Sequence, residues 1–231
     1  MSAQWHARRK QRSNYEDEGW IVMRKWGHMD KRILFIGGSP CSGKSTVAER
    51  IAKKYGAFYF KVDDFLEQFM ERAAQTGYPA CKKCMEMTPD ETWMREPSIQ
   101  CEEEFLVYGE IAAFVFERLE ETDADLIVTE GAAYTPRVMG QHGADDYISI
   151  VPTPAFHISH YREREWVPYI LRDCTDREAA FDNWMQRDIL FAEKVKAECE
   201  NRKIPCLVND GTRTEDELFA TVEKLFALTG F

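Results

Sequence analysis

The sequence predicts an α/β fold in which a parallel sheet is covered by helices on both faces. Short apolar runs are typical of strands buried on both sides, and amphipathic segments between them are typical of helices. Turn and capping residues stand where the two kinds of segment meet. Because parallel strands need crossover connections, this alternation of strands and helices favours a parallel sheet in three layers.

The first elements follow one another closely. Residues 33–36 form a continuous apolar run and predict the first strand. A helix is expected at 45–55, and Gly56 is a plausible helix stop. A second strand is expected at 57–62, followed by a helix through 65–75.

The next segment is expected to be an irregular insertion. Residues 76–100 contain three prolines, which interrupt regular structure. Within them, Thr88-Pro89-Asp90-Glu91 has the capping pattern of one short helix. A long amphipathic helix is then expected at 101–120.

The rest of the chain continues the alternation. Further strands are expected at 126–128, 147–151 and 204–208. Helices are expected at about 155–166, at 176–200, and after the capping sequence Thr214-Glu215-Asp216-Glu217.

The composition is that of one globular domain. At 231 residues the chain is long enough to bury a core. A content of 44% hydrophobic and 30% charged residues excludes a mainly disordered chain. The formal net charge of -10 argues against nucleic acid as a partner, although a local basic groove stays possible.

The charge is unevenly distributed. Residues 1–32 hold eight basic and four acidic residues, whereas the remainder holds 22 basic and 36 acidic residues. We expect a disordered N-terminal tail at 1–28 and one functional domain at 29–231. The basic tail leaves a contact with RNA or membrane open.

The sequence predicts a cytoplasmic protein. No run of about 18 apolar residues is present, and the N-terminus has no apolar segment of the secretory type. The seven cysteines are an odd number in a chain too large for a disulfide miniprotein. We therefore expect reduced thiols and no membrane partner.

A phosphate-binding loop follows the first strand. Residues 38–45 fit the pattern G-x-x-x-x-G-K-[ST], placed between a buried strand and a helix. Glycines let backbone N–H groups surround phosphate oxygens, and the helix directs its positive N-terminus at them. This predicts a P-loop NTPase that uses ATP and Mg²⁺, with Lys44 reaching the β- and γ-phosphates and the Ser45 hydroxyl on Mg²⁺. The expected nucleotide-binding residues are Gly38, Ser39, Pro40, Cys41, Ser42, Gly43, Lys44, Ser45 and Thr46.

Carboxylates end two of the expected strands. Asp63 and Asp64 follow the second strand, and Glu130 follows the strand that begins at Leu126. The carboxyl ends of parallel strands line the ligand site of such sheets. A carboxylate there can take a proton from a substrate hydroxyl or hold Mg²⁺. The alternative is that these carboxylates only face water or cap the following helix.

These motifs together resemble a known family. Gly38–Ser45, Val62-Asp63-Asp64-Phe65 and Val128-Thr129-Glu130-Gly131 look like the uridine kinase and nicotinamide riboside kinase group, within the nucleoside and nucleotide kinase superfamily. The resemblance implies a five-stranded parallel sheet with a helical lid. It also implies that Asp63 is the general base and that Glu130 helps to bind Mg²⁺ with Ser45. We include Asp64 as a further metal candidate.

The expected lid lies at about 155–175. In the family such a lid supplies arginines that neutralise the transferred phosphoryl group. Arg162 and Arg164 are the candidates by position, and Arg187 on the next helix is a weaker one. Pairing with neighbouring glutamates on a solvated helix is the alternative.

The insertion at 76–100 departs from the uridine kinase pattern and occupies the place of the acceptor-binding segment. It contains Cys81 and Cys84, and Cys101 follows. Free thiols in a surface segment, a zinc site and a redox pair are all open.

The sequence therefore predicts a kinase that transfers phosphate from ATP to a hydroxyl of a small metabolite, nucleoside-like or sugar-like. A nucleotide kinase with a phosphate acceptor is one alternative. That acceptor would need arginines, and the 65–100 region offers Arg72 and Arg95. An ATP-binding switch whose cysteine insertion contacts a partner is the other. The acceptor, the choice of ATP over GTP and the oligomeric state stay open.

Overall fold

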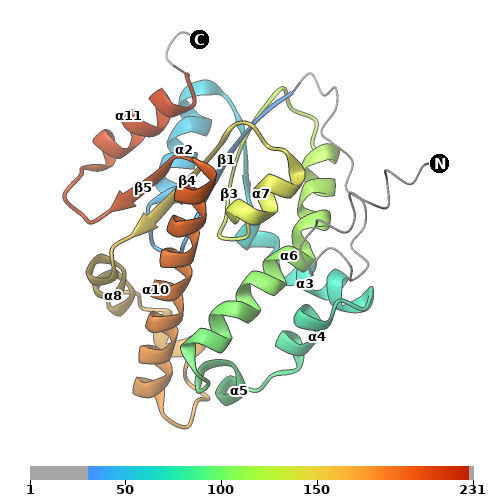
Figure 1. The fold of residues 1–231 in the computed structure, drawn as a ribbon, viewed down its shortest axis with the longest axis vertical. Helices are drawn as coiled ribbons and strands as arrows, with labels where there is room; N and C mark the ends of the chain where they lie inside the picture. The colour runs from blue at the N-terminus through green and yellow to red at the C-terminus, as the bar shows by residue number, and fades with distance from the viewer. Residues whose placement is uncertain (1–30, 229–231) are drawn as a thin grey trace.

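The computed structural model describes residues 31–228, which form one five-stranded parallel sheet with helices on both faces (Figure 1). The strand order is β2-β3-β1-β4-β5. The strands are β1 (Arg32–Gly38), β2 (Phe58–Lys61), β3 (Leu126–Glu130), β4 (Tyr147–Pro152) and β5 (Cys206–Asn209). The sequence prediction of the α/β class with a parallel sheet is confirmed.

The first strand occupies the centre of the sheet. It pairs with β3 from Arg32↔Leu126 to Ile36↔Glu130, and with β4 from Phe35↔Tyr147 to Gly38↔Ile150. Every residue of β1 after Arg32 is buried, as the apolar run predicts. The segment that follows β1 therefore starts in the middle of the sheet at its carboxyl end.

Two helices cover one face of the sheet. Figure 1 shows α2 (Lys44–Tyr55) and α11 (Glu215–Leu225) together on this side. Their apolar residues form one buried cluster with Leu34 and Ile36 of β1. Burial of such aliphatic side chains contributes roughly 1.5–3 kcal/mol each to folding.

A larger helical layer covers the other face (Figure 1). Its long members are α6 (Pro97–Glu121) and α10 (Arg177–Arg202), which pack against each other. Shorter helices complete it: α3 (Leu66–Gln75), α4 (Pro79–Glu86) and α7 (Pro136–His142), with a 3₁₀ turn, η1, at Val62–Phe65. The short helix α5 (Pro89–Trp93) packs against α10.

The structure explains where several helices begin and end. Gly56 ends α2 in the left-handed conformation with φ 66°. Thr88 and Thr214 each form a capping box with the glutamate three residues later, as the sequence predicts. The Asp176 carboxylate accepts hydrogen bonds from two backbone amides at the start of α10.

One expectation about secondary structure was wrong, and one helix was not predicted. Residues 76–100 are not largely irregular, because they contain α4, α5 and the first turn of α6. Their prolines stand at the starts of these helices, where the missing N–H costs nothing. The helix α7 was not expected. It has only seven residues, and the cap of Thr135 before Pro136 was its local signal.

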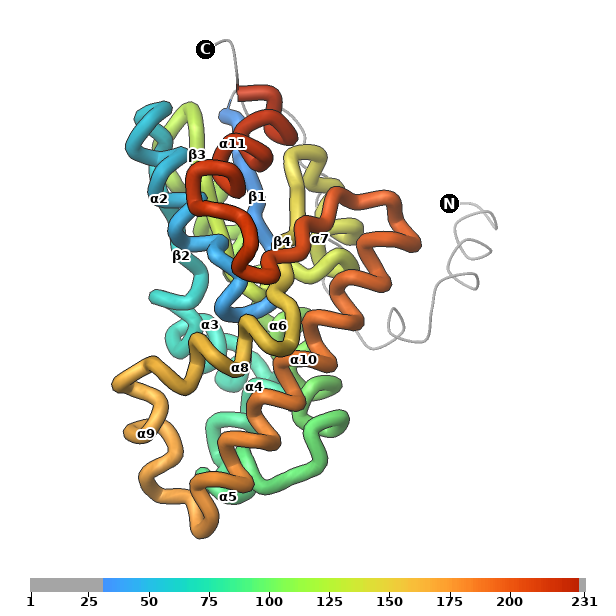
Figure 2. The backbone as a smooth tube through the Cα atoms, turned by 90° about the vertical axis from the view of Figure 1, so that its left-hand side faces the viewer, coloured from blue at the N-terminus to red at the C-terminus, as the bar shows by residue number. Residues whose placement is uncertain are grey.

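Figure 2 shows α9 (Val167–Ile170) toward the end of the molecule where α5 lies and α10 begins, with α8 (Pro154–Arg162) between α9 and the sheet. They share a small core with the first turns of α10, built from Tyr161, Val167, Leu171 and Trp184. These two helices occupy the segment expected to be a lid. The tail expected at 1–28 lies outside the described residues.

Within residues 31–228, no helix combines the length and the apolar character that crossing a bilayer would need.

Candidate functional site

The loop after β1 approaches the neighbouring strand closely at its glycines. Gly38 has φ 117°, and a Cβ at this residue would lie 1.9 Å from the Ile150 carbonyl oxygen. Gly43 has φ 92° and precedes the first turn of α2. Cys41 also has a positive φ, 60°. Only glycine fits at residue 38, and without a side chain there the backbone of the loop can lie close against β4 at the carboxyl end of the sheet.

Lys44 lies folded into this loop. Its Nζ donates to the Ser39 carbonyl oxygen at 2.6 Å and lies 3.4 Å from the Ser42 hydroxyl. Burial lowers the pKa of Lys44, whereas the charges of Glu130 and Asp63 raise it. An anion bound in the loop would therefore stabilise the charged form of the buried Lys44.

Ser45 and Glu130 meet at the start of α2. The Ser45 hydroxyl donates to Glu130 Oε1 at 2.9 Å, and the Tyr59 hydroxyl donates to the same oxygen at 3.0 Å. Glu130 is 1% exposed. A hydroxyl and a carboxylate side by side are hard oxygen ligands, so these residues fit Mg²⁺.

The two aspartates after β2 face different surroundings. Desolvation raises the pKa of Asp63, the nearby Lys44 opposes this, and Glu130 adds to it. Asp63 keeps a solvent-exposed surface. Asp64 is more open and lies 3.8 Å from Lys61 Nζ. The structure thus brings Asp63 together with Lys44 and Glu130, and places Asp64 in a surface ion pair.

The two arginines of the expected lid also lie in different surroundings. The Arg164 guanidinium donates to Cys41 Sγ at 3.5 Å, and its Cζ lies 4.9 Å from the Tyr161 ring. Arg162 is exposed, with its Cζ 5.4 Å from the Phe181 ring. Of these two arginines, Arg164 is therefore the one that touches the phosphate loop.

A charged cluster lies beside Asp63, between α6 and α10. The Arg187 guanidinium donates to Asp188 Oδ1 at 2.6 Å, and its Nε lies 3.3 Å from Glu104 Oε2. His157 Nε2 lies 3.2 Å from the other Asp188 oxygen. Glu104 and Asp188 were missed in the sequence, because each lies inside a long helix and no local motif marks it.

The charges in this cluster act on one another. Burial disfavours ionisation of Asp188, but Arg187 and His157 outweigh it and lower the pKa of that carboxyl. Burial also disfavours the charged form of Arg187, and here Asp188 and Glu104 raise its pKa. The pKa of Glu104 is raised, chiefly by desolvation.

Aromatic rings surround the cluster. The rings of Trp93 and Trp184 lie 4.5 Å apart, and Tyr161 packs against Trp184 at 5.3 Å. The Arg187 Cζ lies 5.2 Å from the Trp93 ring. Trp93, the last residue of α5, therefore connects the insertion to the candidate site.

The loop after β5 contacts the phosphate loop. The Asn209 side chain donates to the Ser42 carbonyl oxygen at 3.1 Å. Asp210 accepts hydrogen bonds from the Thr212 backbone and hydroxyl, which is a local turn of the usual Asx type. The contact of Asn209 was not predicted.

The cysteines of the insertion lie in helices. Cys81 and Cys101 are buried, whereas Cys84 is half-buried, so the segment is not a surface loop of thiols. Among residues 31–228 there is no group of three histidine, cysteine or acidic side chains that could hold a metal.

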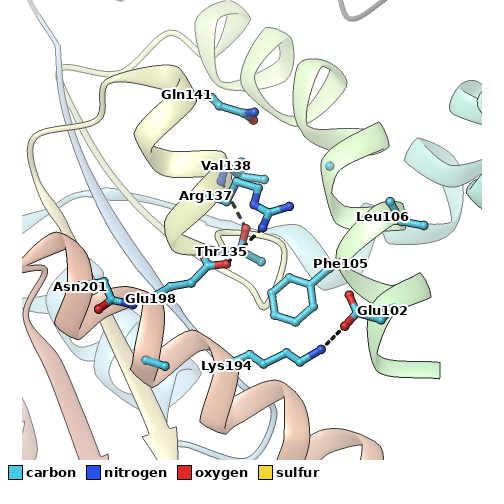
Figure 3. Close-up of a pocket in the computed structure, with 12 residues that line it drawn as sticks. Glu102, Phe105, Leu106, Thr135, Arg137, Val138, Gln141, Lys194, Glu198 and Asn201 are labelled. Atoms are coloured by element: carbon cyan, nitrogen blue, oxygen red, sulfur yellow. Dashed lines mark hydrogen bonds and ion pairs between the residues drawn. The ribbon is translucent and has the colours of Figure 1, made fainter. Parts of the chain in front are cut away.

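A groove of about 330 Å³ lies away from the phosphate loop, between α6, α7 and α10 (Figure 3). It is bordered by two ion pairs, Lys194 with Glu102 and Arg137 with Glu198. None of its lining residues belongs to the phosphate loop, so this groove is not the nucleotide site.

The parallel sheet, the glycine-containing loop after β1 and the helix that this loop begins define an α/β protein of the P-loop NTPase fold.

No protein-family model matches the chain, and no curated protein matches it in sequence. Among solved structures it is similar to TT1252 from Thermus thermophilus, at 19% identity over 87% of this chain and 99% of that one, with a TM-score of 0.48. A gluconokinase from Sinorhizobium meliloti 1021 is 14% identical over 89% and 94%, with a TM-score of 0.40. A shikimate kinase from Bacteroides thetaiotaomicron is 15% identical over 86% and 98%, with a TM-score of 0.41. At these identities and scores the likenesses assign no activity to this chain.

Proposed function

We propose that this protein is a kinase that transfers the γ-phosphoryl group of ATP, with Mg²⁺, to a hydroxyl group of a small metabolite. The observation that carries the proposal is the joint placement of Lys44, the Ser45–Glu130 hydrogen bond and Asp63 at the carboxyl end of the sheet. These are the groups that phosphoryl transfer to a hydroxyl requires: an anion-binding cation, metal ligands and a base.

Each residue has a role that its surroundings support. The loop amides and Lys44 hold the phosphates. Ser45 and Glu130 would hold Mg²⁺, which when bound neutralises charge on the phosphate oxygens. Asp63 orients the acceptor hydroxyl and takes its proton. Its raised pKa makes it a stronger base than an ordinary aspartate.

Arg164 is the residue we assign to the transferred group. It lies against Cys41 of the phosphate loop and extends from the segment between α8 and α9. A guanidinium there would balance the negative charge that spreads over the phosphoryl oxygens during transfer. We propose that residues of about 155–175 act as the lid, and that Arg162 contributes less than Arg164.

A hydroxyl acceptor is favoured over a phosphate acceptor. Arg72 Nη1 lies 2.6 Å from Glu117, and Arg95 Nη1 lies 2.6 Å from Glu103. Both arginines of the acceptor region that could receive an acceptor phosphate are thus already paired with carboxylates. The narrower resemblance to uridine and nicotinamide riboside kinases continues to depend on the short motifs alone.

The proposed setting is the cytoplasm, where ATP and Mg²⁺ are available. All seven cysteines are free thiols in the structure, which supports a reducing environment.

The test is ADP formation from ATP and Mg²⁺ in the presence of pooled nucleosides, sugars, vitamins and small alcohols. The proposal expects that at least one pool accelerates ADP formation and that Asp63→Asn abolishes the acceleration. Tight ATP binding without acceleration by any pool would instead support the ATP-binding switch, whose partner would contact the α4–α5 segment.

A further inference from the structure

The charged cluster between α6 and α10 is built from fixed contacts. Arg187 contacts Glu104 at 3.3 Å and Asp188 at 2.6 Å, and the Tyr108 hydroxyl donates to Glu104 Oε1 at 2.8 Å. The Asp188 side chain is fully buried, whereas those of Glu104 and Arg187 are 12% and 15% exposed. Glu104 and Arg187 are therefore partly exposed to solvent, and the buried Asp188 carboxylate holds Arg187 in place.

Its position connects the proposed base to the phosphate loop. The charge of Asp63 acts on Glu104 and Tyr108, and the charge of Asp188 acts on Lys44. We place the remainder of an acceptor whose hydroxyl lies at Asp63 near this cluster, where Trp93 of α5 also lies 5.2 Å from the Arg187 Cζ.

Two buried polar atoms beside the cluster have no hydrogen-bond partner among the described residues. One is the donor Nε1 of Trp184, and the other is the acceptor Oε1 of Gln100. Both residues are 5% exposed and contact Trp93, which also lies against Arg187. An unpaired buried donor and acceptor are costly, and a hydroxyl group can satisfy either one.

The charged groups of the cluster are already paired with one another. A carboxylate or phosphate would need a free cation, yet Arg187 already faces two carboxylates, Glu104 and Asp188. A cationic acceptor would have to compete with Arg187 for these two carboxylates, and the guanidinium of Arg187 also lies 5.2 Å from the Trp93 ring and 6.0 Å from the Trp184 ring.

We propose that Glu104, Arg187 and Asp188 form the acceptor-recognition element of this kinase and that they select an uncharged polyhydroxylated compound. Glu104 and Arg187 hydrogen-bond to its hydroxyls, and Asp188 positions Arg187. This inference rests on the proposed function, because it concerns the acceptor of the same reaction.

The experiment measures initial rates of ADP formation with acceptors that share a skeleton and differ in charge. The sets are glucose, gluconate and glucosamine; ribose and ribose 5-phosphate; and uridine and uridine 5′-monophosphate. We expect acceleration by an uncharged member, at least about tenfold above its charged counterparts. Acceleration by an anionic or cationic member equal to or above that of its uncharged counterpart would overturn the inference while leaving the kinase proposal standing.

A variant then tests the residues. Glu104→Gln keeps the shape of the side chain and frees Arg187 from one carboxylate. We expect it to raise the KM of the uncharged acceptor at least about tenfold, to leave the KM of ATP within about twofold, and to improve use of the anionic counterpart. The matched control is Glu102→Gln, on the same helix, where Glu102 pairs with Lys194 at the surface and none of the three values should change.

The outcomes separate the two proposals. If Glu104→Gln changes the KM of the acceptor and that of ATP equally, or lowers thermal stability without a KM split, the cluster is structural and the inference is wrong. If no acceptor in these sets or in the pools accelerates ADP formation while ATP still binds, the proposed function fails and the inference fails with it. If the acceptor found in the pools is not an uncharged polyhydroxylated compound, only the inference fails.

Discussion

The Ser45 hydroxyl donates a hydrogen bond to Glu130 at 2.9 Å, and this contact joins the first turn of α2 to the last residue of β3. The two residues are 85 positions apart in the chain. They meet because β3 lies next to β1, so that the ends of both strands open at the same edge of the sheet. The phosphate loop and the proposed metal ligands therefore share one rigid support.

Glu130→Gln should lower kcat/KM by roughly 100-fold, because it removes a buried negative charge from the proposed metal site. Tyr59→Phe is the matched comparison, since the Tyr59 hydroxyl donates to the same oxygen at 3.0 Å but carries no charge. That variant should cost less than about fivefold. The Mg²⁺ concentration at half-maximal rate should rise for Glu130→Gln alone, and equal shifts in both variants would contradict the assignment.

Asp63 and Asp64 can be separated by substitution to asparagine. Asp63→Asn should lower kcat by at least roughly 100-fold, since it removes the proposed base. Asp64→Asn should retain most activity, because Asp64 lies in a surface ion pair with Lys61. Equal losses in the two variants would support Asp64 as a metal ligand and would contradict the separate roles assigned to the two aspartates.

The same assignment has a pH signature. The base must be ionised to act, and its surroundings raise the pKa of Asp63 above 3.8. Activity should therefore fall, on acidification, at a higher pH than an ordinary aspartate would give. A pH profile of kcat/KM on the wild-type chain measures this, and an acid limb at or below pH 3.8 would count against Asp63 as the base.

Much of the fold and part of the site could be predicted from local sequence. The phosphate-binding pattern is complete within residues 38–45, and the apolar run at 33–36 predicts the strand that precedes it. The sequence could not predict which of Asp63 and Asp64 would face Lys44 and Glu130, because this depends on the 3₁₀ turn that follows β2. The Glu104–Arg187 contact joins two helices through residues 83 positions apart in the chain, and only tertiary packing creates it.

Arg164 and Arg162 offer a second matched pair. Arg164→Gln should lower kcat by roughly 100-fold with little change in the KM of ATP, because its guanidinium reaches the phosphate loop at Cys41. Arg162→Gln should stay within about threefold of wild type, since its side chain is exposed beside Phe181. Single-turnover rates would separate the chemical step from product release. A larger effect at Arg162 would indicate that the lid rearranges before transfer.

The buried His142 should make the free energy of unfolding depend on pH, independently of catalysis. Its ring is 4% exposed and stacks on Phe116 with centroids 3.5 Å apart. Burial lowers the pKa of His142 from 6.5 to about 4. Between these two pH values the unfolded chain binds more protons than the folded one. The stabilising contribution of neutral His142 to the free energy of unfolding is therefore complete above pH 6.5 and is lost as the pH falls toward 4.

At pH 5 this histidine alone should make the free energy of unfolding about 2 kcal/mol lower than at pH 7.5. Urea unfolding at the two pH values measures the difference. In His142→Phe, which keeps an aromatic ring against Phe116 but cannot take up a proton, the difference should shrink by about that 2 kcal/mol. His160→Gln serves as the control, because His160 is exposed on α8. An unchanged pH dependence in His142→Phe would mean that the buried ring is not the group that titrates.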